Sequence, residues 1–188
     1  MADMNERVRL KQLNRKMVVS AYDCVGTLVT ALIVLSLLLS YAFRIVGVDG
    51  RSMLPSLKDG DMLLLNTYDD SYRRGDVIVI ERYTDTPLVK RVIAFGGETI
   101  AIKDDGSVIV NGKVLNERYV QGKTLRNDFP KNTTVTVPHG YLFVMGDNRT
   151  TAGSSLDSRS DEIGFVSVKD VVGKAVYRVW PMKSIGSV

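Results

Sequence analysis

The chain has 188 residues and a formal net charge of +4 at pH 7, so one domain can bury a sizeable core without disulfide support. Beyond the first sixteen positions its basic and acidic residues are interspersed, which argues against a nucleic-acid partner. The single cysteine, Cys24, excludes an intrachain disulfide or a zinc knuckle. The single histidine, His139, lies between Pro138 and Gly140 in a context typical of an exposed turn, which disfavours a Ser-His-Asp triad.

An uncharged apolar run covers residues 24–43. As a helix it spans roughly 30 Å, the thickness of the hydrocarbon core of a bilayer. Five basic residues and two acidic ones precede the run within positions 1–16. By the positive-inside rule we expect 1–16 to be cytoplasmic, 17–43 to be a single anchor in the plasma membrane, and 44–188 to be extracytoplasmic.

A cleavable secretory signal is the alternative for this run, which ends in Ser40-Tyr41-Ala42 with small residues at alternate positions. The apolar part of such a signal is usually about 7–15 residues long. The run is longer than that, which favours a retained anchor. A buried core helix is disfavoured, because the run is apolar on all faces and no second segment of this character could cover it.

Short β-branched runs separated by Gly, Asp and Asn follow the anchor and predict an all-β domain. Strands are expected at residues 62–65, 76–80, 89–95, 99–102, 107–110, 133–137, 141–145 and 171–180. The turn sequence Asp104-Asp105-Gly106 predicts a hairpin between the fourth and fifth of these strands. Residues 98–139 contain this hairpin and a looser polar stretch, and we expect them to form a small insertion on the main sheet.

Ser52 lies in a turn framed by Gly50 and Pro55, shortly after the anchor. A serine hydroxyl is a weak nucleophile until a base removes its proton. A lysine can be that base if burial penalises its charged form. Lys90 meets this condition if residues 89–95 are a strand, because its side chain then lies on an apolar face and that of Arg91 on the other.

Each of these residues also has a structural explanation. Ser52 could cap a turn, and Lys90 with Arg91 could be an exposed pair on an edge strand. Met53 and Leu54 favour a functional role for the turn over a purely structural one. An exposed apolar pair there fits contact with the membrane surface or with an apolar substrate.

Two polar boxes follow, G-D-N-R at 146–149 and S-x-D-S-R at 155–159. They could form a polar loop with local Asp/Arg pairs. They could also be a scaffold that fixes the lysine amine and holds the turn of the serine.

Taken together, these segments resemble the type I signal peptidase family of membrane-anchored Ser-Lys endopeptidases, in its Gram-positive form with a single anchor. The resemblance covers the anchor, the S-M-x-P box, the G-D-V-I-V and K-R-V strands and both polar boxes, in the order of the family. It implies a mainly β, signal-peptidase-like catalytic domain with a small inserted hairpin subdomain, preceded by one transmembrane helix. Its expected partners are signal-peptide-bearing preproteins and the lipid bilayer.

The resemblance also implies roles for individual residues. It makes Ser52 the nucleophile and oxyanion donor through its backbone N–H, Lys90 the general base, and Ser155 the residue that orients the lysine amine. Residues that would support the site are Asp147 with Arg91, Asp157 with Arg159, and Gly50, Met53 and Pro55. Gly50 has no hydroxyl, so the side-chain oxyanion donor of some family members is missing. No metal or cofactor is needed.

The chain departs from the family pattern at Ser56, where the family usually has Thr, and in a longer link between Arg149 and Ser155, which leaves Ser154 as an alternative contact of the lysine. Two other functions stay open. A self-cleaving Ser-Lys peptidase of the repressor type shares the serine box but lacks an anchor. A membrane-anchored β-domain could bind exported proteins without cutting them.

Overall fold

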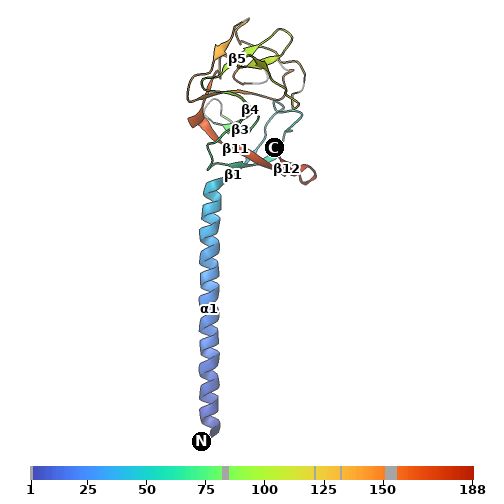
Figure 1. The fold of residues 1–188 in the computed structure, drawn as a ribbon. Helices are drawn as coiled ribbons and strands as arrows, with labels where there is room; N and C mark the ends of the chain where they lie inside the picture. Colours follow the sequence, from blue (N-terminus) through green and yellow to red (C-terminus); the bar gives the residue numbers. More distant parts are fainter. Residues whose placement is uncertain (1, 82–84, 121, 132, 151–155) are drawn as a thin grey trace. The chain divides into compact units, whose positions relative to one another are not determined.

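The computed structural model describes residues 2–81, 85–120, 122–131, 133–150 and 156–188 (Figure 1). The chain divides into two compact units, Met1–Ala42 and Phe43–Val188. The first is helical and the second is built mainly from β-strands. This confirms the predicted fold class.

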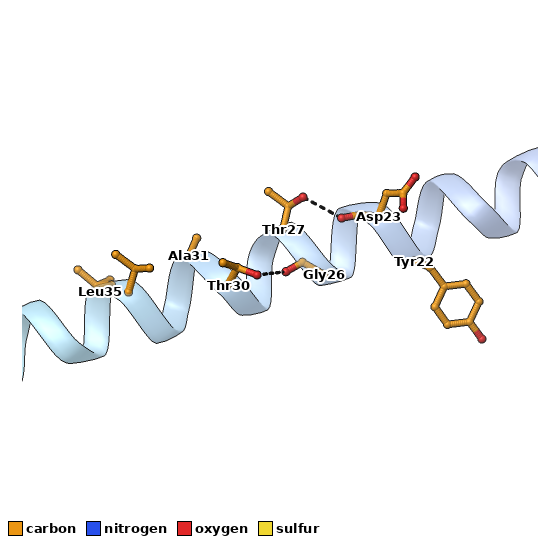
Figure 2. A pocket seen from close by; sticks show the side chains of 8 residues that line it. Tyr22, Asp23, Gly26, Thr27, Thr30, Ala31 and Leu35 are labelled. Carbon is orange, nitrogen blue, oxygen red and sulfur yellow. Dashed lines mark hydrogen bonds between the residues drawn. The ribbon is translucent and has the colours of Figure 1, made fainter.

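The first unit is the helix α1 (Ala2–Ala42). Its stretch Arg15–Ala42 is long and apolar enough to cross a membrane by length and composition. Figure 2 shows Thr27 and Thr30 on this helix, whose hydroxyls each donate to the carbonyl four residues earlier at 2.8 Å. These hydroxyls are therefore satisfied within the helix.

The larger sheet of the second unit has eight strands within the described residues, in the order β1-β2-β11-β3-β4-β9-β10, with β12 paired to β11. All of its pairs are antiparallel. The strands are β1 (Phe43–Gly47), β2 (Met62–Asn66), β3 (Val77–Ile80), β4 (Leu88–Phe95), β9 (Tyr141–Met145), β10 (Val166–Ser167), β11 (Val171–Trp180) and β12 (Gly186–Ser187). Short 3₁₀ turns, η1 (Val168–Asp170) and η2 (Met182–Ser184), flank β11.

A second sheet has the order β7-β6-β5-β8, and its strands fall within the predicted insertion. They are β5 (Thr99–Ile102), β6 (Val108–Val110), β7 (Lys113–Val114) and β8 (Val135–Thr136). Antiparallel pairing of Ile100 with Val110 confirms the predicted hairpin. Each strand expected from the sequence is present within two residues of its expected bounds, whereas β1, β7, β10 and β12 were not expected.

The middle of the larger sheet is covered on both faces. Along β3, Val77 and Val79 pack in one hydrophobic cluster, and Ile78 and Ile80 pack in another. This explains the uninterrupted apolar sequence of β3, because a strand buried on both faces has no polar side to alternate with. The neighbouring strand β4 is equally enclosed, and its side chains from Val89 to Ala94 are all buried.

Candidate active site

The turn that contains Ser52 follows β1 directly. The Gly60 N–H donates to the Val48 carbonyl at 2.9 Å, which closes the base of the turn. Gly50 has a φ of +84°, a conformation that a residue with a side chain rarely adopts, and its N–H donates to the Asp59 carboxylate at 2.9 Å. The turn is thus held in shape beside the half-buried Ser52 side chain.

The expectation that Met53 is exposed was wrong. Its side chain is 1% exposed and packs in a hydrophobic cluster with Leu57 and Leu63. The reason is a helical turn of backbone, in which the Leu57 N–H donates to the Met53 carbonyl at 2.9 Å and so directs both side chains inward. Leu54 remains partly exposed, and Pro55 is exposed.

Lys90 lies on β4, between β3 and β9 in the interior of the larger sheet. Its side chain is 3% exposed, which excludes the exposed pair on an edge strand. The Lys90 Nζ atom is 2.9 Å from the Ser52 Oγ atom, within hydrogen-bond distance. The structure therefore brings together the two residues to which the sequence analysis gave the central roles.

Burial lowers the pKa of the Lys90 ammonium from its ordinary value of 10.5 to about 8. The carboxylates of Asp157 and Asp147 act in the opposite direction, while the Arg159 guanidinium lowers the pKa further. No carboxylate in the described part of the chain forms an ion pair with Lys90. A neutral amine is therefore accessible near physiological pH.

Arg91 and Asp147 form the first of the two expected ion pairs. The guanidinium donates to both carboxylate oxygens, at 2.8 and 2.6 Å. It also donates to the Gly75 carbonyl at 2.5 Å, and its Cζ atom lies 4.2 Å from the centre of the Tyr119 ring. This two-pronged geometry fixes β4 relative to the loop after β9.

Asp157 and Arg159 form the second pair, with distances of 2.9 and 2.7 Å between the guanidinium and the carboxylate oxygens. Asp157 also accepts a hydrogen bond from the Gly146 N–H at 3.2 Å, and Arg159 donates to the Leu125 carbonyl at 2.8 Å. The pair thus joins the second polar box to the first box and to the segment of chain between β7 and β8.

Arg149 forms a third buried pair that the sequence analysis did not find. Its side chain is fully buried, and it contacts Glu117 at 2.6 and 3.3 Å and the Thr124 hydroxyl at 2.9 Å. Glu117 lies 32 residues earlier in the sequence, in the predicted insertion. No local pattern marks such a pair, because the two residues meet only through the tertiary fold.

Ser155 and the alternative Ser154, which were expected to contact the lysine amine, lie outside the described residues. Among the described residues, no group of three or more His, Cys, Asp or Glu side chains is arranged to hold a metal ion.

Comparisons with known proteins place this chain in a family. The profile of the family described as "Signal peptidase, peptidase S26" matches residues 21–180. The chain is 38% identical to signal peptidase I of Bacillus caldolyticus over 166 residues, which cover 81% of this chain and 88% of the relative. It is 35% identical to signal peptidase I P of Bacillus subtilis subsp. natto over 173 residues, covering 87% and 91% respectively.

Among solved structures, a signal peptidase I from Enterococcus faecalis matches with a TM-score of 0.44 and 30% sequence identity, over 55% of this chain and 96% of the other. The sequence matches identify the class of this protein as a serine peptidase. More particularly, the chain belongs to the signal peptidase family, peptidase S26.

Proposed function

We propose that this chain is a membrane-anchored endopeptidase that removes N-terminal signal peptides from exported preproteins, with Ser52 as nucleophile and Lys90 as general base. The observation that carries the proposal is the distance of 2.9 Å between the Lys90 Nζ and Ser52 Oγ atoms, with the lysine side chain only 3% exposed. Membership of the signal peptidase family supports the reaction and the class of substrate.

The chemistry begins with the neutral form of Lys90. Its amine accepts the Ser52 hydroxyl proton, and the Oγ atom forms a bond to the carbonyl carbon of the scissile peptide. The protonated lysine then gives this proton to the leaving amine as the peptide bond breaks, leaving an acyl ester on Ser52. Water, deprotonated by Lys90, attacks the ester, and the proton returns to the Ser52 oxygen.

The other expected residues complete the site in this proposal. The Ser52 backbone N–H stabilises the oxyanion that forms on the attacked carbonyl, and Ser155 orients the lysine amine. The ion pairs Arg91–Asp147 and Arg159–Asp157 keep β4 and the two polar boxes in register. Their buried two-pronged contacts support this structural role.

The preprotein binds as an extended segment with main-chain hydrogen bonds, and small side chains occupy the first and third positions before the cut. The test uses the full chain in detergent and a peptide with one small-x-small site. We expect mass spectrometry to find one cut, directly after that site, and no cut with Ser52→Ala or Lys90→Ala. A Lys90→Ala protein with near-normal activity would exclude this dyad.

We also propose that residues 1–16 are cytoplasmic, 17–43 anchor the chain, and 44–188 form an extracytoplasmic domain that contacts the bilayer surface. An exposed apolar face supports the contact. Ile45 on β1 pairs with Leu64 on β2, which pairs with Tyr177 on β11. Exposed side chains on and beside these strands are Phe43, Ile45, Met62, Tyr177, Trp180, Met182 and Ile185.

Trp180 is the single tryptophan of the chain, so its fluorescence reports on this face alone. In reconstituted vesicles, we expect lipids brominated near the headgroup to quench Trp180 emission. Absence of quenching would mean that the face does not touch lipid. Protease added outside sealed cells should digest the domain and spare residues 1–16, and the opposite result would reverse the proposed orientation.

A further inference from the structure

Asn148 holds the nucleophile turn at two consecutive carbonyl groups. Its backbone N–H donates to the Ser52 carbonyl at 2.9 Å, and its side-chain Nδ2 donates to the Arg51 carbonyl at 3.1 Å. The Asn148 side chain is 8% exposed, so water competes little for these contacts. A residue 97 positions away in the sequence thus fixes the backbone on the N-terminal side of the nucleophile.

The orientation of the Asn148 amide follows from its other contacts. Its Oδ1 atom accepts hydrogen bonds from the Thr150 N–H at 3.3 Å and from the Thr150 hydroxyl at 2.6 Å. A backbone N–H can only donate, so the oxygen of the amide must face Thr150. The amide nitrogen therefore faces Arg51, and its hydrogen bond to the carbonyl is well defined.

The Arg51 carbonyl and the Ser52 N–H belong to the same trans peptide group, which is planar and directs the two bonds to opposite sides. A contact that fixes the direction of the carbonyl therefore fixes the direction of the N–H. Among the described residues, this N–H makes no hydrogen bond. In the proposed function, this Ser52 N–H donates a hydrogen bond to the oxyanion.

We infer that Asn148 is a positioning residue that aims the Ser52 N–H at the oxyanion of the reaction. This inference rests on the proposed function of Ser52 as nucleophile. Asn148 does not touch the substrate, and it acts through the peptide group between Arg51 and Ser52.

Two glycines make the contact of Asn148 with the serine turn important for the direction of the Ser52 N–H. A Cβ atom on Gly146 would lie 2.5 Å from the Ser52 carbonyl oxygen and 3.3 Å from its carbon, so a larger residue would push the turn away from Asn148. Gly50 offers no side-chain hydroxyl to the oxyanion. The direction of the backbone N–H is therefore more important here than in a site with a second donor.

The test compares wild type with Asn148→Ala in the full detergent-solubilised chain. Because loss of one oxyanion donor typically lowers kcat by about 10²–10³-fold, we expect misalignment of the donor to lower kcat by roughly 10²-fold. KM should stay within about twofold, since the donor acts on the transition state more than on the bound substrate. The pH at which kcat reaches half its plateau should not move, because Lys90 is untouched.

A pair of inhibitors separates positioning from general damage. In a peptide aldehyde, the carbonyl carbon bonds to Ser52 Oγ and the carbonyl oxygen enters the oxyanion site, while the matching peptide alcohol cannot react. We expect Asn148→Ala to weaken the aldehyde by about the same factor as kcat and the alcohol by less than about twofold. Equal weakening of both inhibitors, or a loss of kcat below threefold, would overturn the inference.

Two further variants guard against a folding defect. Thr150→Val removes one of the two donors that orient the amide, and it should lower kcat by about fivefold with an unchanged Tm. Should Asn148→Ala fail to fold, an unchanged kcat in Thr150→Val would overturn the inference. Asn116→Ala changes an exposed asparagine and should have no effect. Cleavage by wild type and its loss in Ser52→Ala test the proposed function separately.

Discussion

Lys90 and Arg91 are neighbours on one buried strand, yet their surroundings differ. Lys90 is 3% exposed and Arg91 8% exposed. Arg91 has both oxygens of Asp147 within 2.8 Å. Lys90 has the Ser52 hydroxyl at 2.9 Å, and in the described part of the chain no carboxylate forms an ion pair with it.

The difference separates structural charges from chemical ones. A buried cation with a two-pronged carboxylate partner stays charged and holds elements together. A buried amine with only a hydroxyl partner is easily deprotonated, which is what a general base needs. Arg149 and Arg159 follow the first pattern, with Glu117 and Asp157 as partners.

Lys90→Arg replaces the amine that can lose its proton by a guanidinium like that of Arg91. Of the changes considered, it should have the largest effect on activity. A guanidinium stays protonated at any working pH, so it cannot take the Ser52 proton. We expect kcat for peptide cleavage to fall by about 10⁴-fold, the upper range for loss of a general base. Steady-state kinetics with a fluorogenic peptide would measure the loss.

Lys174→Arg is the matched control, because Lys174 lies in the same sheet and contacts Asp76 at 3.4 Å. It should keep kcat within about twofold, since its ion pair is partly exposed and outside the site. Retention of more than a tenth of wild-type activity by Lys90→Arg would show that another group is the base.

Asp147→Asn tests the opposite half of the comparison. It leaves the Arg91 guanidinium buried without a counter-charge, and breaking a buried pair from one side typically costs about 3–5 kcal/mol. We expect the free energy of unfolding to fall by that amount. Urea unfolding followed by the fluorescence of Trp180 would measure it.

The control for this change is Asp104→Asn. Asp104 pairs with Arg126, but its side chain is 65% exposed. Exposed pairs contribute about 0–1 kcal/mol, so stability should hardly change. Similar losses in the two variants would mean that burial does not distinguish these pairs.

Lys90→Met should make the protein inactive and, at pH 7, more stable. The pKa of Lys90 falls from 10.5 to about 8 on folding, which at about 1.4 kcal/mol per pH unit corresponds to a penalty of about 3 kcal/mol for the charged form. Methionine fills a similar volume without this penalty. A Lys90→Met protein that is less stable than wild type at pH 7 would contradict the expected cost of burying the ammonium.

The pH dependence of stability tests whether burial of the Lys90 ammonium destabilises the folded state. Between pH 8 and 10.5 the unfolded lysine keeps its proton and the folded one has lost it, so the unfolded state binds more protons. Wild-type stability therefore rises with pH across this window, and the advantage of Lys90→Met should disappear there.

Local sequence patterns predicted the longer strands well but missed β1 and the two-residue strands β7, β10 and β12. The hairpin of β5 and β6 followed from β-branched runs and a Gly-containing turn, which are local signals. Phe43–Gly47 follows the helix directly and is apolar except for Arg44, so one charged residue was the only change of composition near its start. Met53 was placed wrongly because an apolar residue in a polar turn shows only that it differs from its neighbours, and not which way it points.

The site was less accessible to sequence reasoning, because its contacts join distant segments. Ser52 and Lys90 are 38 residues apart, and periodicity alone favoured neither over an ordinary serine or lysine. Their proposed roles came from the order of motifs shared with a family. The contact of Asn148 with Arg51 spans 97 residues and depends on how two turns pack, so only the structure reveals it.

The pH dependence of cleavage gives the smallest effect and the finest test of the comparison. Only the neutral amine of Lys90 is active, so activity should rise with pH along a limb centred on the Lys90 pKa of about 8. Below that pH, kcat should fall about tenfold per unit, since each unit reduces the neutral fraction tenfold. A limb near 10.5 would mean that water reaches the amine and that burial does not tune it. Stopped-time assays from pH 6 to 10 would separate these outcomes.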